Sequence, residues 1–148
     1  MSPELIGIAV GIGVVVPTIY FIRKREFDSR VWPVFLFTLP VYYMLFGLLA
    51  MNGTVILNEL LFGLPYIATG LIVWRIKSRL SLYLIAIAWL SHGFYDYYHD
   101  LLFVNPGVFS WYPAFCAVVD LAVGGYLLAD SKRLTQSFKT HSSEKLPE

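Results

Sequence analysis

Histidine and aspartate recur at helical spacing in one otherwise apolar stretch of the chain. His92, Asp96, His99 and Asp100 follow one another there at intervals of four, three and one residues. At about 100° per residue, these side chains fall within an arc of roughly 100° on one face of a helix. Imidazole and carboxylate groups at such spacings can share a divalent cation or exchange protons. The pattern therefore predicts a helix with one polar, chemically active stripe.

Two further carboxylates, Asp120 and Glu59, lie within neighbouring apolar stretches. At about 1.5 Å per residue, Asp120 lies about 18 Å and His92 about 16 Å below the outer ends of their stretches, so the two are nearly level. Glu59 comes level with His99 by the same count. We therefore expect these groups to converge in one pocket that opens toward the outer face.

The acids of this pocket outnumber its bases, and unpaired charge is expensive in an apolar medium. A bound Zn, Mn or Fe(II) ion would remove the excess, since histidine and carboxylate suit these metals. The predicted ligands are His92, Asp96, His99 and Asp120. Glu59 and Asp100 are then the predicted general acid and base. Cys116 is either a further soft ligand or a small packing residue.

Each of these residues also has a structural interpretation. Protonated carboxyls would remove the excess charge without any metal. Asp120 and His92 could form only an interhelical hydrogen bond. Residues nearer the outer end, Glu59, His99 and Asp100, could be solvated by interfacial water.

The composition places the chain in a membrane. Hydrophobic residues make up 57% and charged residues 14%, with a mean hydropathy of +0.65, which is far from the balance of a soluble domain. Lone Cys116 excludes an internal disulfide framework. The basic residues serve topology, so the chain has no nucleic-acid partner in this interpretation.

Five stretches are long enough to cross a bilayer, which needs about 20 apolar residues per helix. We predict an all-α, compact antiparallel bundle of five transmembrane helices at about 4–22, 31–50, 54–74, 80–103 and 108–129. All eleven Lys and Arg residues fall in the loop at 23–30, the loop at 75–79 or the segment after 130. Because basic residues mark cytoplasmic loops, this predicts an N-terminus outside and a C-terminus inside, in the plasma (inner) membrane.

The domain organisation follows from these spans. Residues 1–130 are predicted to form a single transmembrane domain, and 131–148 a cytoplasmic, polar, disordered tail. The Gly7-x-x-x-Gly11 pattern allows close helix approach, either within the chain or in a homo-oligomer.

Three functions fit this pattern. The first is a small metal-dependent membrane enzyme acting on a lipid-soluble substrate. The second is a proton- or cation-coupled carrier subunit, although the inner halves of the spans are nearly free of ionisable groups. The third is a non-catalytic protein that binds membrane lipid or a hydrophobic small molecule. The sequence favours the enzyme by a small margin and identifies no substrate.

Overall fold

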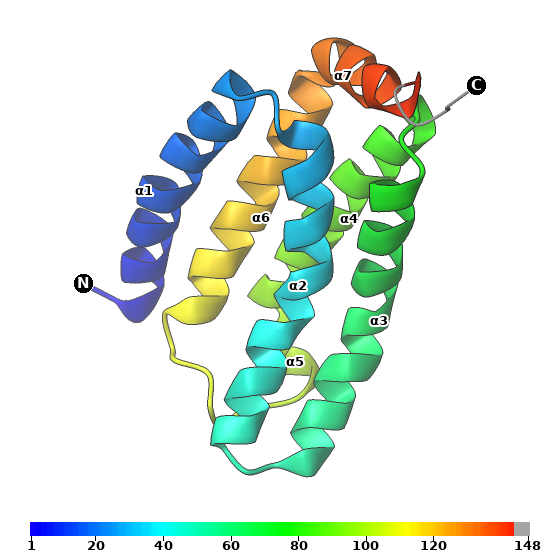
Figure 1. Ribbon diagram of the computed structural model, residues 1–148. Helices are drawn as coiled ribbons and strands as arrows, with labels where there is room; N and C mark the ends of the chain where they lie inside the picture. The colour runs from blue at the N-terminus through cyan, green and yellow to red at the C-terminus, as the bar shows by residue number, and fades with distance from the viewer. Residues whose placement is uncertain (144–148) are drawn as a thin grey trace.

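The structure, a computed structural model, is all-helical over the residues it describes, 1–143 apart from the side chains of 137 and 139–143. The long helices lie side by side and run up and down, and a short helix, α7, crosses one end (Figure 1). The elements are α1 (Pro3–Lys24), α2 (Asp28–Leu49), α3 (Gly53–Arg75), α4 (Arg79–Tyr97), α5 (His99–Leu102), α6 (Tyr112–Ala129) and α7 (Ser131–Ser143).

Polar caps fix where three of these helices begin. Ser2 Oγ accepts a hydrogen bond from the Leu5 amide at 3.4 Å at the start of α1. Asn52 and Ser78 cap α3 and α4 in the same manner. Each cap satisfies a backbone N–H that has no partner within its own helix, which stabilises the start of that helix.

Glycines allow some of the helices to approach closely. A Cβ on Gly7 would lie 2.2 Å from the Trp111 carbonyl oxygen, and one on Gly11 3.1 Å from the Phe115 carbonyl oxygen. The Gly7 and Gly11 face of α1 therefore packs against the N-terminal part of α6 in the same chain. The most extensive helix pairings elsewhere are α2 with α3 and α4 with α6.

Four helices, α1, α2, α3 and α6, are long and apolar enough to cross a membrane. The predicted spans near 4–22, 31–50 and 54–74 agree with α1–α3 within a few residues. The predicted span 80–103 does not form one helix: α4 ends at Tyr97 and α5 follows after a break. Its polar second half, which holds His92 and Asp96, makes α4 less apolar than the other four. The span predicted from 108 begins as a helix only at Tyr112.

The prediction of a disordered tail from residue 131 differs from the structure over Ser131–Ser143, which form helix α7. Leu134 and Phe138 of this helix are fully buried against the ends of the other helices. These two apolar side chains lie one turn apart and form the face of α7 that packs on the bundle, while its remaining residues are polar. Residues 144–148 lie outside the described part of the chain.

Candidate metal centre and its polar surroundings

The predicted proximity of His92 and Asp120 is confirmed. The Nδ1 atom of His92 lies 2.7 Å from Asp120 Oδ2 and 3.2 Å from Asp96 Oδ2. All three residues are at most 2% exposed. Their potential ligand atoms lie within 4.8 Å of one another, which makes them the one candidate metal group among the described residues.

Helix geometry and close packing bring this group together. His92 and Asp96 are four residues apart, so α4 presents them on one face. Gly93 stands beside His92, and a Cβ there would lie 3.1 Å from both the Ala117 carbonyl oxygen and Asp120 Cβ. The missing side chain lets α6 approach α4 closely enough for Asp120 to reach the imidazole.

One oxygen of each carboxylate in this group accepts no hydrogen bond. Asp96 Oδ1 and Asp120 Oδ1 are buried and have no hydrogen-bond partner. A buried carboxylate oxygen without a partner is costly, because it has lost its water and gained nothing in return. Two carboxylates and one imidazole therefore form a set of metal ligands, and a divalent cation bound to them would give the carboxylates a partner. A shared ion would hold its ligand atoms about 3–4 Å apart, so the 2.7 Å contact between His92 Nδ1 and Asp120 Oδ2 would lengthen.

A second buried polar cluster is centred on Glu59, which is 2% exposed. Its Oε1 accepts a hydrogen bond from Asn105 Nδ2 at 2.8 Å and lies 2.9 Å from His99 Nε2. Its Oε2 accepts a hydrogen bond from the Tyr95 hydroxyl at 2.9 Å. Three partners thus satisfy one carboxylate and tie α3 to α4, α5 and the following loop.

The structure places His99 in this second cluster rather than beside His92. The His99 ring stacks on Tyr43, with 4.7 Å between ring centroids, and its Nδ1 lies 3.3 Å from Asp100 Oδ1. Asp100 itself is on the surface, with its side chain 72% exposed. The predicted single pocket is therefore two neighbouring clusters, because the break after Tyr97 turns His99 toward α3. The ligand role of His99 and the acid–base roles of Glu59 and Asp100 remain predictions.

Two members of the Glu59 cluster were not expected from the sequence. Tyr95 lies outside the predicted polar stripe, but it is partly buried and its hydroxyl donates to Glu59. Asn105 lies between two predicted spans, yet it is 3% exposed and also donates to the Tyr43 carbonyl oxygen at 3.0 Å. An asparagine followed by Pro-Gly is so typical of turns that its side chain gives no further signal.

A third polar cluster lies at the opposite end of the bundle. Fully buried Asp28 accepts hydrogen bonds from Trp32 Nε1, Tyr126 Oη and Arg133, at 3.0, 2.7 and 3.2 Å. Partial burial opposes the charged form of Arg133, but its bonds to Asp130 and Asp28 raise the pKa of the guanidinium. No pattern in the sequence points to Asp28, which stands among the basic residues of a predicted loop.

Apolar side chains separate this third cluster from the candidate metal centre. Buried Trp32 and Trp89 meet edge to face with 5.9 Å between ring centroids, and Ile85, Val123 and Leu127 are also buried in this core. No chain of described polar side chains crosses this core.

Asp120 also lines a cavity of about 490 Å³ between α2 and α6. Cys116, one turn from Asp120 on α6, lines it too and is 7% exposed. The candidate metal centre therefore borders a groove on the side of the bundle. A smaller cavity at the end near α5 includes Asp100 and Glu4 but none of the three candidate ligands.

No protein-family model, curated protein or solved structure matches this chain. Its function is therefore inferred from the chemistry of the buried His92, Asp96 and Asp120 group in an apolar helical bundle.

Proposed function

We propose that this protein is a small metal-dependent membrane enzyme that acts on a lipid-soluble substrate, with its ion held by His92, Asp96 and Asp120. The observation that carries the proposal is the pair of buried, unpartnered oxygens, Asp96 Oδ1 and Asp120 Oδ1, within the one compact ligand group of the described chain. Two carboxylates balance the charge of a divalent cation, whereas one neutral imidazole cannot.

The ligand set also favours a catalytic ion over a structural one. Structural zinc sites use four protein ligands, while catalytic sites use three and leave a position open. Two oxygens and one nitrogen suit Zn, Mn or Fe(II). When bound, such an ion would supply a Lewis acid for a polar group of the substrate.

The surrounding residues support this role. Close packing of Tyr66, whose ring meets the His92 ring edge to face at 4.5 Å, restrains the imidazole. The three ligand residues are at most 2% exposed, and this burial strengthens electrostatic interactions at the site. The Glu59 cluster holds the 103–111 loop over this end of the bundle through Asn105.

Metal analysis of the purified protein tests the proposal. Wild-type protein in mild detergent, from cells grown with added zinc, manganese and iron, should carry about one ion per chain. His92→Ala and Asp120→Asn should each lose it. Asp100→Asn, which changes an exposed carboxylate, should keep it. Wild-type protein without stoichiometric metal would contradict the proposal.

The proposal includes the orientation predicted from the basic residues. In Figure 1 the loops at 25–27 and 76–78 and helix α7 share one end of the bundle, so the basic residues gather there. Under the positive-inside rule this end faces the cytoplasm. A reporter active in the cytoplasm should work when fused after Glu148 and fail when inserted at 104–107; the reverse pattern would overturn the orientation.

Non-catalytic binding of a hydrophobic molecule is the second candidate, and the apolar groove between α2 and α6 favours it. A carrier is less well supported, since the Trp32 and Trp89 layer interrupts any polar path in the described chain. Binding of a ligand by protein that holds no metal would favour the binder over the enzyme.

A further inference from the structure

A pocket of about 420 Å³ lies between the end of α1 and the start of α7, at the end of the bundle that carries the basic residues. Its lining consists of Tyr20, Arg23 and Lys24 of α1, Glu26 of the following loop, and Arg133 of α7. Three of these side chains are cationic and one is anionic, so the lining presents a net positive charge. The pocket shares no residue with the candidate metal centre.

The arginine from α7 is held in place by the protein itself. Arg133 Nε donates a hydrogen bond to Asp130 Oδ2 at 2.6 Å. Its Nη2 donates to Tyr126 Oη at 2.6 Å and to Asp28 Oδ2 at 3.2 Å. The side chain nevertheless keeps 30% exposure. A guanidinium fixed in this way loses little conformational freedom when it binds an oxyanion, and its planar set of N–H groups suits the oxygens of a phosphate.

The two cations from α1 are accessible to a ligand. Arg23 Nη2 lies 3.6 Å from Asp130 Oδ2, and the Arg23 side chain is 55% exposed, so this is a loose surface ion pair that contributes little energy. Lys24 is also exposed. The nearby acids do not reverse the field, because the segments 23–30, 75–79 and 130–148 hold all eleven basic residues of the chain and only five acids. An anion is therefore attracted to this end of the bundle.

The pocket continues into the apolar surface of α1. Tyr20 lines the pocket, and Val16 and Ile12 precede it at intervals of four residues, so the three side chains share one face of the helix. They are 66%, 60% and 50% exposed. Helix α1 is long and apolar enough to cross a membrane, and Arg23 and Lys24 lie in its last turn. The cations thus come at the depth of lipid headgroups, next to an exposed apolar face that an acyl chain can cover.

We propose that the pocket between α1 and α7 binds the headgroup of an anionic phospholipid, with its phosphate at Arg23, Lys24 and Arg133. One acyl chain of this lipid lies along the face of α1 that holds Val16. A free phosphate would use the cations but not the apolar face, whereas a phospholipid uses both, so the observations favour the lipid. The inference goes beyond the proposed function, because it involves neither the metal nor catalysis and is independent of the orientation of the chain.

Lipid titration of the full-length protein tests this binding. Protein purified in mild detergent is titrated with phosphatidylglycerol, or with phosphatidylcholine of the same acyl chains, and native mass spectrometry counts the lipids bound. Phosphatidylglycerol should bind as one saturable molecule per chain and at least about tenfold more tightly than phosphatidylcholine, whose cationic choline would meet the basic lining. Equal affinity for the two lipids, or no saturable binding of phosphatidylglycerol, would overturn the inference.

Soluble competitors separate a lipid from a free phosphate. Glycerophosphoglycerol carries the same headgroup without acyl chains, and inorganic phosphate carries the anion alone. Each should displace phosphatidylglycerol no better than ammonium acetate of the same ionic strength, which weakens the attraction only by screening. Displacement beyond this effect of salt would show that the pocket recognises the phosphate without its chains, and it would overturn the assignment to a lipid.

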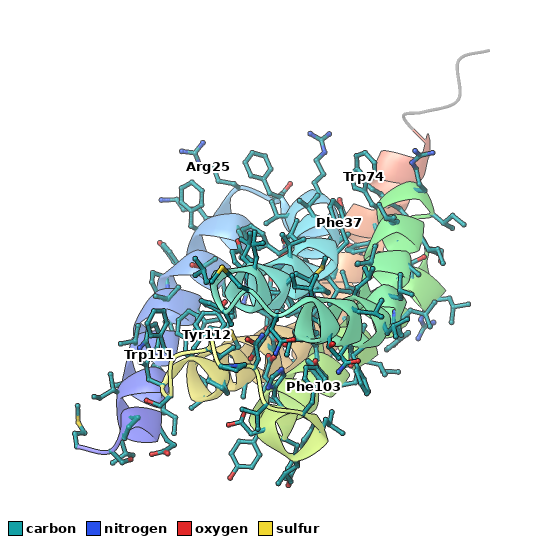
Figure 2. The ribbon with its side chains drawn as sticks, turned by 90° about the horizontal axis from the view of Figure 1, so that it is seen from below. Arg25, Phe37, Trp74, Phe103, Trp111 and Tyr112 are labelled. Carbon is teal, nitrogen blue, oxygen red and sulfur yellow. The ribbon has the colours of Figure 1, made fainter. Side chains whose placement is uncertain are left out.

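Two neighbouring basic residues provide a matched pair of variants. Both are exposed, so neither change should disturb the fold. Lys24→Gln removes one cation from the pocket and should weaken phosphatidylglycerol binding about fivefold, the effect of one basic residue near an anionic headgroup. Arg25→Gln removes the same charge outside the pocket: Figure 2 shows Arg25 directed away from the bundle, and its guanidinium carbon lies 5.2 Å from the centre of the Phe21 ring. This variant should bind as the wild type does. Equal weakening in both would indicate attraction to the general surface charge and would contradict a site in the pocket.

Discussion

The Nδ1 atom of His92 lies 2.7 Å from Asp120 Oδ2, and this contact joins α4 to α6 across 28 positions of sequence. Both side chains are almost completely buried. A hydrogen bond explains this distance directly, whereas a shared metal ion would explain the proximity of the two groups while holding the atoms about 3–4 Å apart. The two explanations differ in how stability responds to metal.

If a metal occupies this group, adding it to chelator-treated protein should stabilise the fold. At a free concentration one hundred times its Kd, the ion should add about 2.7 kcal/mol to the free energy of unfolding, because it binds only the folded bundle. Thermal unfolding in detergent with Zn, Mn or Fe(II) measures this. Asp120→Asn should lose the response, and Asp100→Asn should retain it. If Asp120→Asn is as stable as wild type and neither responds to metal, Asp120 is a protonated structural residue instead.

Replacement of Glu59 by glutamine should loosen the end of the bundle near the 103–111 loop. The glutamine NH₂ would face at least one of the donors that now bond the carboxylate, leaving a buried polar group unsatisfied at a cost of about 1–3 kcal/mol. Hydrogen exchange should be faster at 103–111, and the free energy of unfolding should fall. Glu4→Gln, at an exposed position on α1, is the matched control and should change little. If hydrogen exchange at 103–111 is unchanged in Glu59→Gln, the Glu59 carboxylate is not required to hold Asn105 and its loop in place.

Two glycines of α1 should respond oppositely to alanine. The new methyl group of Gly7→Ala would meet backbone atoms of Trp111 and Phe115, so α1 must move away from α6 at a cost of about 1–3 kcal/mol. Gly13→Ala meets nothing within 4 Å and should be neutral or slightly stabilising, since alanine favours the helix. Unfolding of both variants in mixed micelles measures the difference. Equal stabilities would show that α1 does not pack on α6 through Gly7.

Helix α7 should depend on Asp28. In Asp28→Asn the ion pair with Arg133 is lost, although the side chain keeps its size. The amides of α7 should then exchange with solvent faster, while those of α3 stay protected. Glu26→Gln, on an exposed residue of the loop just before Asp28, provides the comparison and should leave α7 as it is. Unchanged exchange in Asp28→Asn would mean that buried Leu134 and Phe138 are sufficient to hold α7.

The sequence by itself determined the helical class and much of the candidate site. Apolar length predicted five membrane spans, and four of the helices in the structure are long and apolar enough to cross a membrane. Helical periodicity placed His92 and Asp96 on one face, and counting residues placed Asp120 at the same depth. These are local or one-dimensional properties, which the order of residues fixes directly.

Only the tertiary structure decided which groups meet. The rotation of α6 about its axis cannot be obtained from hydropathy, because most of its circumference is apolar; close packing at Gly93 turns Asp120 toward His92. The sequence also did not predict the helix break after Tyr97. This break directs His99 to Glu59 instead of to the candidate metal centre. Contacts between helices depend on the packing of side chains from distant parts of the chain, and no single stretch of sequence contains that information.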